Sequence, residues 1–397
     1  MNTSCSSRGR ASLFVLCSAF LWPGSLFPQG ALTPPGGPLP TMKSLDQLDA
    51  KLEARTPISA IPFTITAPGS YYLTNNVTVA VPDGVGIIIQ ADDVTIDLNG
   101  FTMVGGGGGT AYGIRAAVTQ QNICIRNGTV RGFANGGVRG ENCRNSFFEA
   151  LRVSDIGGGG SGTLTAGIAA GPGSTVKDCV VHAMIGAVPG LRSGDGCTFT
   201  GCTVTGGGSG SGGKGFDLGS FVTVVNCTAQ GNTGIGISVG SGSTVTHCTA
   251  SANLSTGFSI GPGSTIVECT AGANGGSGIQ TAFGAEVRNC TARSNAMSGI
   301  IVPNECYVVG NNCSNNNTTN TAGYVGGLIA TGEANRIEAN SCVYNANLGL
   351  ASEVTDSLSI IVRNSARGNT ANYVGTVWAT PAGNAPISTQ PWINFNY

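Results

Sequence analysis

The stretch Val224–Val302 contains one short phrase written four times at a fixed interval. The copies are VVNCTAQGNTGIGISV (224–239), VTHCTASANLSTGFSI (245–260), IVECTAGANGGSGIQT (266–281) and VRNCTARSNAMSGIIV (287–302). Their cysteines stand 21 residues apart, and the glycine before each closing apolar group keeps the same step. A constant period of this length is typical of a solenoid, in which each repeat buries its apolar face against its neighbours.

The spacing inside one repeat predicts short β-strands. Small or apolar residues stand at Val245, Cys248 and Ala250 with polar residues between them, and no 3.6-residue period is sustained. The wider gap between Val245 and Cys248 breaks the alternation and predicts a bend just before the cysteine. The residues at this bend are Asn226, His247, Glu268 and Asn289. Because Asn tolerates left-handed backbone, this residue choice suits a recurrent bend.

A second corner is predicted where an asparagine precedes a glycine by four positions. The four asparagines are Asn232, Asn253, Asn274 and Asn295. A turn of this length with two or three bends is the size of one turn of a parallel β-helix, whose turns stack at ~4.8 Å.

The same frame extends beyond the four copies, to about a dozen turns in all. Earlier segments that fit are Ile125-x-x-Gly128, Phe148-x-x-Leu151, Val176-x-x-Cys179 and Phe199-x-x-Cys202. After the regular block the frame is expected to drift, with Cys313 and Cys342 each two positions after an asparagine and Val362-x-x-Ser365 closing the series. The sequence therefore predicts an all-β, single-stranded parallel β-helix, and parallel crossovers favour the right-handed form.

These phrases resemble the right-handed parallel β-helix proteins of the pectin-lyase-like superfamily, and in particular secreted repeat proteins of the NosD type. The segments PGSYYLTNNVTV (68–79) and DDVTIDLNGFTMVG (92–105) resemble the first turns of such proteins. The resemblance covers about residues 60–375 and implies the fold. It does not imply one chemistry, because the superfamily includes lyases, hydrolases, epimerases and members with no known activity.

The first 30 residues have the form of a secretory signal. Arg8 and Arg10 precede the apolar run Ala11–Leu21, which is too short to span a bilayer, so we expect export. Three further segments are expected: a Pro/Gly linker with a short helical cap (31–59), the β-helix (60–377) and an aromatic C-terminal cap (378–397).

Composition argues against two classes of function. Charged residues make up 10% of the chain and the net charge is −1, without the basic patch that nucleic-acid binding needs. The glycine tracts are not followed by Lys-Ser or Lys-Thr as in a phosphate-binding loop.

The 14 cysteines predict a ladder of thiols more than a disulfide framework. Cys5 and Cys17 lie in the signal. Six others occupy one position in successive turns: Cys179, Cys202, Cys227, Cys248, Cys269 and Cys290. Their Cβ atoms would lie ~4.8 Å apart, beyond the ~3.8 Å of a relaxed disulfide, so buried free thiols are expected. Pairing stays open for Cys124, Cys143, Cys197 and Cys306. With no C-x-x-C pair and two histidines, no metal site is predicted.

The resemblance implies where chemistry would lie if the protein were an enzyme. Lyases of the superfamily use acidic Ca²⁺ ligands with a basic Arg or Lys, and its hydrolases use close carboxylates. The corresponding motifs are absent, so no catalytic residue can be carried over. Asp92, Asp93 and Asp97 belong to the first turns, and we expect them to be structural.

Longer turns between residues 155 and 217 hold the remaining candidates, because function concentrates in long loops on a rigid scaffold. One hypothesis gathers them in a groove. The candidate catalytic residues are Asp155, Asp178, His182 and Asp195, and the candidate substrate-binding residues are Arg192, Lys214 and Asp217. Asp178 or His182 would serve as general base, and Arg192 or Lys214 would neutralise a substrate carboxylate. The alternative is a set of solvated loop charges.

An outward column of threonines raises a further alternative, an ice-facing surface. The column is Thr203, Thr228, Thr249, Thr270 and Thr291. A lattice-matching face needs two adjacent columns, and few turns supply a T-x-T pair, as at 198–200 and 244–246. This hypothesis is therefore the weakest.

Two hypotheses for the function remain. The first is a secreted or cell-surface solenoid, non-enzymatic, that contacts an extracellular glycan or another surface component. The second is an extracellular polysaccharide lyase or hydrolase, and only this alternative would need a cofactor, Ca²⁺. The thinly charged sequence favours the first hypothesis but leaves catalysis undecided. Both place the protein outside the cell, at its surface or in the periplasm, with no nucleic-acid partner and no membrane span after signal removal.

Overall fold

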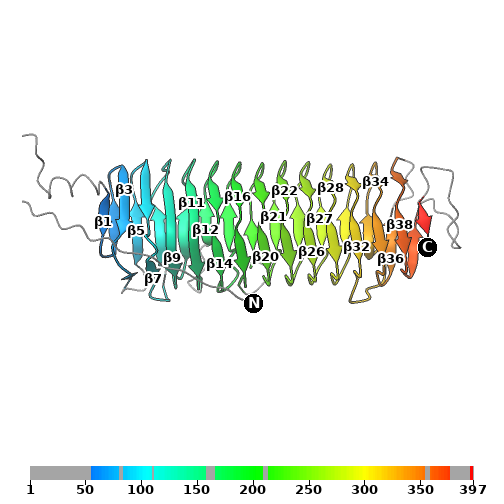
Figure 1. Ribbon diagram of the computed structural model, residues 1–397, viewed down its shortest axis with the longest axis horizontal. Helices are drawn as coiled ribbons and strands as arrows, with labels where there is room; N and C mark the ends of the chain where they lie inside the picture. Colours follow the sequence, from blue (N-terminus) through cyan, green and yellow to red (C-terminus); the bar gives the residue numbers. More distant parts are fainter. Residues whose placement is uncertain are drawn as a thin grey trace, which may run out of the picture. The chain divides into compact units, whose positions relative to one another are not determined.

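A computed structural model describes residues 55–79, 84–109, 111–157, 166–208, 213–353, 358–375 and 394–396. In this part of the chain each strand pairs in parallel with its counterpart in the next turn, and the turns stack into a β-solenoid (Figure 1). The described residues contain no helix, so none that could cross a membrane is found among them. The predicted all-β parallel solenoid is confirmed.

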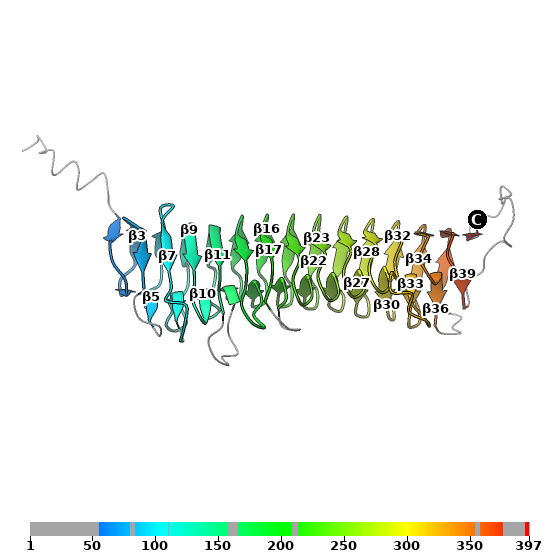
Figure 2. The ribbon, with the colours of Figure 1, turned by 90° about the horizontal axis from the view of Figure 1, so that it is seen from below.

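The described strands form two sheets that run along the solenoid on different sides (Figure 2). Sheet B has 14 strands, one from each turn. They are β2 (Phe63–Ile65), β5 (Val85–Ile89), β8 (Tyr112–Ala116), β10 (Gly136–Gly140), β12 (Ala166–Ala170), β15 (Leu191–Ser193), β18 (Phe216–Asp217), β21 (Ile237–Val239), β24 (Phe258–Ile260), β27 (Ile279–Thr281), β30 (Ile300–Val302), β33 (Gly326–Ala330), β36 (Leu348–Ser352) and β39 (Ala371–Val374).

Sheet A has 26 described strands, because most turns add two strands to it with a bend between them. The strands before the bend, or spanning it, are β1 (Thr56–Ile58), β3 (Gly69–Leu73), β6 (Val94–Asp97), β9 (Cys124–Arg131), β11 (Phe147–Ser154), β13 (Thr175–Lys177), β16 (Thr198–Thr200), β19 (Thr223–Val225), β22 (Thr244–Thr246), β25 (Thr265–Val267), β28 (Glu286–Arg288), β31 (Tyr307–Val309), β34 (Arg336–Glu338) and β37 (Ile360–Val362). The strands after the bend are β4 (Val77–Thr78), β7 (Thr102–Val104), β14 (Val180–His182), β17 (Thr203–Thr205), β20 (Thr228–Gln230), β23 (Thr249–Ser251), β26 (Thr270–Gly272), β29 (Thr291–Arg293), β32 (Asn312–Ser314), β35 (Ser341–Val343), β38 (Ser365–Arg367) and β40 (Phe395–Asn396).

The bend inside sheet A lies where the repeat predicts it. Asn226, His247, Glu268 and Asn289 have φ values of 54°, 55°, 53° and 53°. One left-handed residue turns the chain between β22 and β23, and an equivalent residue does so in the neighbouring turns. Each turn of the regular block therefore has three straight sides, one in sheet B and two in sheet A.

The repeat cysteines form the predicted inward ladder. All six are buried free thiols. The main-chain N–H of Cys227 donates to Cys248 Sγ at 3.4 Å, and that of Cys248 donates to Cys269 Sγ at 3.3 Å. The four cysteines whose pairing the sequence left open, which begin at Cys124, are free thiols as well.

The asparagines of the second corner form another buried ladder. Asn253 Nδ2 donates to Asn274 Oδ1 at 3.0 Å and to the main-chain oxygen of Ala229 at 3.2 Å. The same pattern links successive turns through Asn232, Asn253, Asn274, Asn295, Asn316, Asn345 and Asn369. These amides satisfy main-chain groups that the corner would otherwise leave buried and unpaired.

The expected drift of the frame after residue 302 is wrong. Asn311 occupies the ladder position next to Cys290, whose N–H donates to Asn311 Oδ1 at 2.8 Å. Cys313 instead pairs in register with Ala292, one inward position further along the turn. The last turn follows Ile361-x-x-Asn364 and not Val362-x-x-Ser365. The frame therefore continues unbroken while the ladder residue changes from Cys to Asn.

The segments predicted at the two ends fall mostly outside the described residues. These are the signal (1–30), most of the linker and helical cap (31–59) and most of the aromatic cap (378–397). Strand β1 begins at Thr56, inside the segment predicted as linker and cap. Strand β40, from the segment predicted as C-terminal cap, pairs in parallel with β38.

Candidate functional site

The outward side chains of sheet B lie in rows, because the register stays in phase from turn to turn. One row consists of Arg115, Arg139, Ala169, Arg192 and Asp217. Ala169 thus lies between two arginines on neighbouring strands, and its short side chain leaves the space beside them open.

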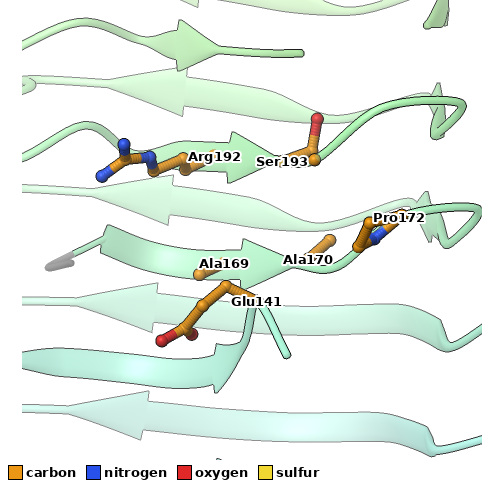
Figure 3. A pocket seen from close by; sticks show the side chains of 7 residues that line it. Glu141, Ala169, Ala170, Pro172, Arg192 and Ser193 are labelled. Carbon is orange, nitrogen blue, oxygen red and sulfur yellow. The ribbon is translucent and has the colours of Figure 1, made fainter. Parts of the chain in front are cut away.

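A pocket of about 240 Å³ occupies this place (Figure 3). Its lining residues come from β12, from β15 and from the residues that follow β10, β12 and β15: Glu141, Ala169, Ala170, Pro172, Arg192, Ser193 and Gly194. We call it the sheet-B pocket. Alanine and proline side chains supply an apolar floor, while a carboxylate and a guanidinium supply polar groups. A mostly apolar concavity with a few placed polar groups is the usual form of a small-molecule site.

One wall of the pocket is fixed by an ion pair. Arg139 Nε donates to Glu141 Oε1, and the Arg139 guanidinium lies 5.0 Å from the centre of the Tyr112 ring. Burial alone would lower the pKa of Arg139, but the hydrogen bond and attraction to Glu141 raise the pKa overall. Arg139 therefore stays charged and holds one oxygen of Glu141.

The opposite side brings together the three substrate-binding candidates named from the sequence. Lys214 Nζ donates to Asp217 Oδ1 at 2.7 Å, and Arg192 Nε lies 4.0 Å from Asp217 Oδ2. Arg192 and Asp217 are register partners on β15 and β18. Of these three residues, Arg192 lines the pocket.

One buried polar atom on the pocket lining, Glu141 Oε2, has no hydrogen-bond partner in the described part of the chain. Ser193 lies in register with the core residue Ala170, and its hydroxyl is a hydrogen-bond partner of the buried Cys197 thiol. Leaving a buried polar atom unpaired costs ~1–3 kcal/mol, and more when the group is charged. The Glu141 oxygen can accept a hydrogen bond. The pocket is therefore suited to a ligand that presents hydroxyl groups.

The four catalytic candidates named from the sequence do not line this pocket. Asp155, Asp178 and His182 lie on sheet A. Asp178 occupies the left-handed bend with φ 51° and lies 3.7 Å from Lys177 Nζ, while His182 Nδ1 lies 2.9 Å from Thr205 Oγ1. The structure therefore does not bring the catalytic candidates and the substrate-binding candidates into one groove.

The other two catalytic candidates have local structural partners. Asp155 has φ 55°, and its Oδ2 accepts a hydrogen bond from Ser154 Oγ at 2.9 Å. Asp195 follows β15 and accepts the N–H of Ser220 at 2.7 Å, which ties one turn to the next.

The acidic residues of the first turns also have local partners. Asp92 accepts the N–H of Gln121, and Asp93 accepts Asn122 Nδ2, each across one turn. Asp97 accepts the N–H of Asn99 and forms ion pairs with two arginines. These contacts agree with the structural role expected for the three aspartates.

Glu141 and Ser193 were not among the residues named from the sequence. Glu141 follows β10, outside the lengthened turns that hold the sequence candidates, and serines are too frequent in this chain to stand out. A usable signal was the phrase Arg139-x-Glu141 placed one turn before a strand of alanines. No three His, Cys, Asp or Glu side chains gather as metal ligands within the described ranges.

The comparisons with known proteins concern the fold. Residues 166–312 match the family model described as "Right handed beta helix region". This stretch is a right-handed β-helix. The match agrees with the superfamily resemblance at the level of the fold, whereas the narrower NosD-type resemblance stays a prediction. No curated protein matches the chain in sequence.

Three solved structures illustrate the likeness. The Azotobacter vinelandii mannuronan C-5 epimerase AlgE4 A-module is 16% identical, with a TM-score of 0.45 over 78% of this chain and 87% of that one. The periplasmic alginate epimerase AlgG is 12% identical, with a TM-score of 0.45 over 80% and 78%. The Dettilon tailspike protein gp208 is 17% identical, with a TM-score of 0.40 over 81% and 61%.

Proposed function

We propose that this solenoid is an exported glycan-binding protein that holds an acidic sugar unit in the sheet-B pocket without cleaving it. The observation that carries the proposal is the unpartnered buried atom Glu141 Oε2, which lies beside Arg192 and above an apolar floor. Export rests on the signal-like residues 1–30.

A sugar ring matches both halves of the lining. Its C–H groups would pack on Ala169 and Pro172, and one of its hydroxyls would donate to Glu141 Oε2. The volume of about 240 Å³ lies below the usual range for drug-sized ligands, which fits one ring of a longer chain.

The charges around the pocket favour an acidic sugar. The charged residues on and beside this part of sheet B include the cations Arg115, Arg139, Arg192 and Lys214, against the anions Glu141, Asp195 and Asp217. A guanidinium binds a carboxylate through two parallel hydrogen bonds, and Arg192 is the cation that lines the pocket. A polymer containing uronic acids is therefore the preferred ligand class.

Binding without turnover is favoured because the lining offers one carboxylate, and Arg139 already holds one of its oxygens. Glycoside hydrolysis generally uses two carboxyl groups, one on each side of the bond.

The free oxygen of Glu141 does favour one second candidate, a polysaccharide lyase in which Glu141 is the base and Arg192 neutralises the substrate carboxylate.

Filling the pocket tests the proposal. Ala169→Trp would block the pocket, whereas Ser238→Trp places the same ring in the same outward row outside it. We expect oligouronates to bind residues 32–397 in calorimetry, Ala169→Trp to weaken that binding at least ~10-fold, and Ser238→Trp to leave it unchanged. Neutral oligosaccharides of equal length should bind more weakly.

Unchanged binding by Ala169→Trp would overturn the assignment of the pocket. The same samples should be screened for turnover of uronic-acid polymers, with and without Ca²⁺, by absorbance of unsaturated ends and by reducing sugar. Turnover that Glu141→Gln abolishes would replace the binding proposal with the lyase alternative.

A further inference from the structure

We propose a second binding site for an acidic sugar on sheet A, in a depression around Gly272. The depression has a volume of about 350 Å³. It is lined by Thr249, Ser251, Thr270, Gly272, Ala273, Arg293 and Ser294, from β23, β26, β29 and the residues after them. We call it the sheet-A depression. It is separate from the sheet-B pocket, with which it shares no residue.

The depression exists because one outward position lacks a side chain. The register places Ser251, Gly272 and Arg293 in one outward row of sheet A. A Cβ added to Gly272 would meet nothing closer than the main-chain oxygen of Arg293 at 3.9 Å, and Gly272 has no positive φ. Neither backbone conformation nor packing requires glycine at this position. Its effect is to open space between a hydroxyl and a guanidinium.

The lining suits a sugar that carries a carboxylate or sulfate group. Four hydroxyl side chains surround the floor, and the guanidinium of Arg293 stands at its edge. In the described part of the chain, Arg293 has no ion pair, whereas Arg288 of the same turn lies 3.3 Å from Glu286. A guanidinium without a protein partner can offer both of its parallel donors to a ligand oxyanion.

The positions of the two sites decide what they can do together. The sheet-B pocket includes β12. The sheet-A depression begins at β23, and the same turn contributes β24 to sheet B. Sheet B reaches β24 from β12 in four steps, through β15, β18 and β21, so the sites lie about four turns apart. At the spacing of stacked strands this is ~19 Å along the axis, and the sites face different sides. One sugar unit cannot fill both. The solenoid is therefore bivalent and links two segments of acidic glycan, an inference that takes its ligand class from the proposed function.

Calorimetric stoichiometry with a short oligouronate tests this directly. We expect two bound per wild-type chain and one per chain for Arg293→Ala and for Gly272→Leu, whose side chain fills the depression. The matched control is Arg288→Ala, an arginine of the same turn outside the depression, which should keep two. Circular dichroism and the unfolding midpoint verify that each variant is folded. Sulfated and neutral oligosaccharides of equal length distinguish the oxyanion sources.

The outcomes separate the two proposals. A single site that Ala169→Trp removes and Arg293→Ala leaves intact overturns the second site and keeps the proposed function. A single site that Arg293→Ala removes and Ala169→Trp leaves intact overturns the sheet-B pocket as the binding site and keeps the sheet-A depression. No binding by wild type overturns both. With a long polyuronate, the bivalent protein should raise light scattering by cross-linking, and either single-site variant should abolish that rise.

Discussion

At the scale of single residues, one interior position of this solenoid is occupied by cysteine in some turns and by asparagine in others. The ladder that begins at Cys179 continues after Cys290 as Asn311, Asn340 and Asn364. A thiol is a weak donor: Cys269 Sγ bonds the carbonyl of Val267 in its own turn at 3.2 Å and contacts that of Val245 in the preceding turn at 3.6 Å. An amide also bonds the amide of the next turn, since Asn311 Nδ2 donates to Asn340 Oδ1 at 2.9 Å. Asparagine therefore ties neighbouring turns more strongly.

This difference predicts how stability changes when the boundary between cysteine and asparagine in the ladder moves by one turn. In Cys290→Asn the new amide would donate to Asn311 Oδ1 and accept the N–H of Cys269, so we expect stability to be kept or raised. Asn311→Cys replaces the amide acceptor of the Cys290 N–H by a weaker thiol and loses the hydrogen bond to Asn340 Oδ1, which should cost roughly 0.5–1.5 kcal/mol. Denaturant unfolding of both variants checks the order. A larger loss in Cys290→Asn than in Asn311→Cys would contradict this account of the ladder.

A buried thiol outside the ladder gives stability a pH dependence. Burial raises the pKa of Cys143 from 9.0 to about 12. Because the folded state keeps the thiol neutral, its contribution is complete below pH 9.0 and is lost as pH rises towards 12. One such proton corresponds to ~1.4 kcal/mol per pH unit. In Cys143→Ala we expect a flatter loss of unfolding free energy over this interval. Parallel losses in wild type and variant would contradict it.

At the scale of elements, each straight side of a regular turn is a strand of two or three residues, and one residue turns the chain between the two sides in sheet A. Gly201, Asn226, His247, Glu268 and Gly310 occupy this bend in different turns, all with positive φ. Non-glycine residues are strained there, and β-branched ones most of all. The ion pair of Glu268 with His247, at 2.6 Å, is exposed and adds little.

The bend predicts opposite effects for two substitutions of one residue. Glu268→Gly should raise the free energy of unfolding, by up to about 1 kcal/mol, and Glu268→Val should lower it by about 1–2 kcal/mol. The control is Glu286→Val, on β28 of the next turn, where extended backbone favours a β-branched residue. Thermal unfolding orders the three variants. Equal effects of valine at 268 and 286 would show that the bend carries no strain.

Short elements also explain which features the sequence could predict. The period and the break in alternation fix strands, bends and ladder, so the positions of Cys248 and His247 follow from the repeat. Cysteine does not mark the frame after residue 302, because Asn311 takes over the ladder position there. The sequence predicts the candidate site only in part. The three substrate-binding candidates Arg192, Lys214 and Asp217 lie together. Asp178 and His182 lie on sheet A instead. Because each side of a turn is only a few residues long, residues close in sequence lie on different faces of the solenoid.

At the scale of the whole molecule, regular turns that repeat every 21 residues are interchangeable units. Deleting one full period, Thr249–Cys269, joins Cys248 to Thr270. The register partner of Thr228 then becomes Thr270 instead of Thr249, and the amide of Asn232 meets Asn274 instead of Asn253. Every ladder and sheet row therefore closes again. We expect a folded, cooperative protein whose rod is one turn shorter, by ~4.8 Å.

The deletion should also separate the two proposed sites. The sheet-B pocket lies wholly before the deleted turn, so its affinity for an oligouronate should not change, while Gly272 gains Gln230 in place of Ser251 as its row neighbour and the sheet-A depression is partly filled. Deleting half a period, Thr249–Ser259, is the matched control. It removes β23 and most of β24, so sheet edges stay unpaired and apolar side chains lose their places, and circular dichroism should report a destabilised or unfolded chain. Equal stability of the two deletions would mean that the 21-residue register does not hold the solenoid together.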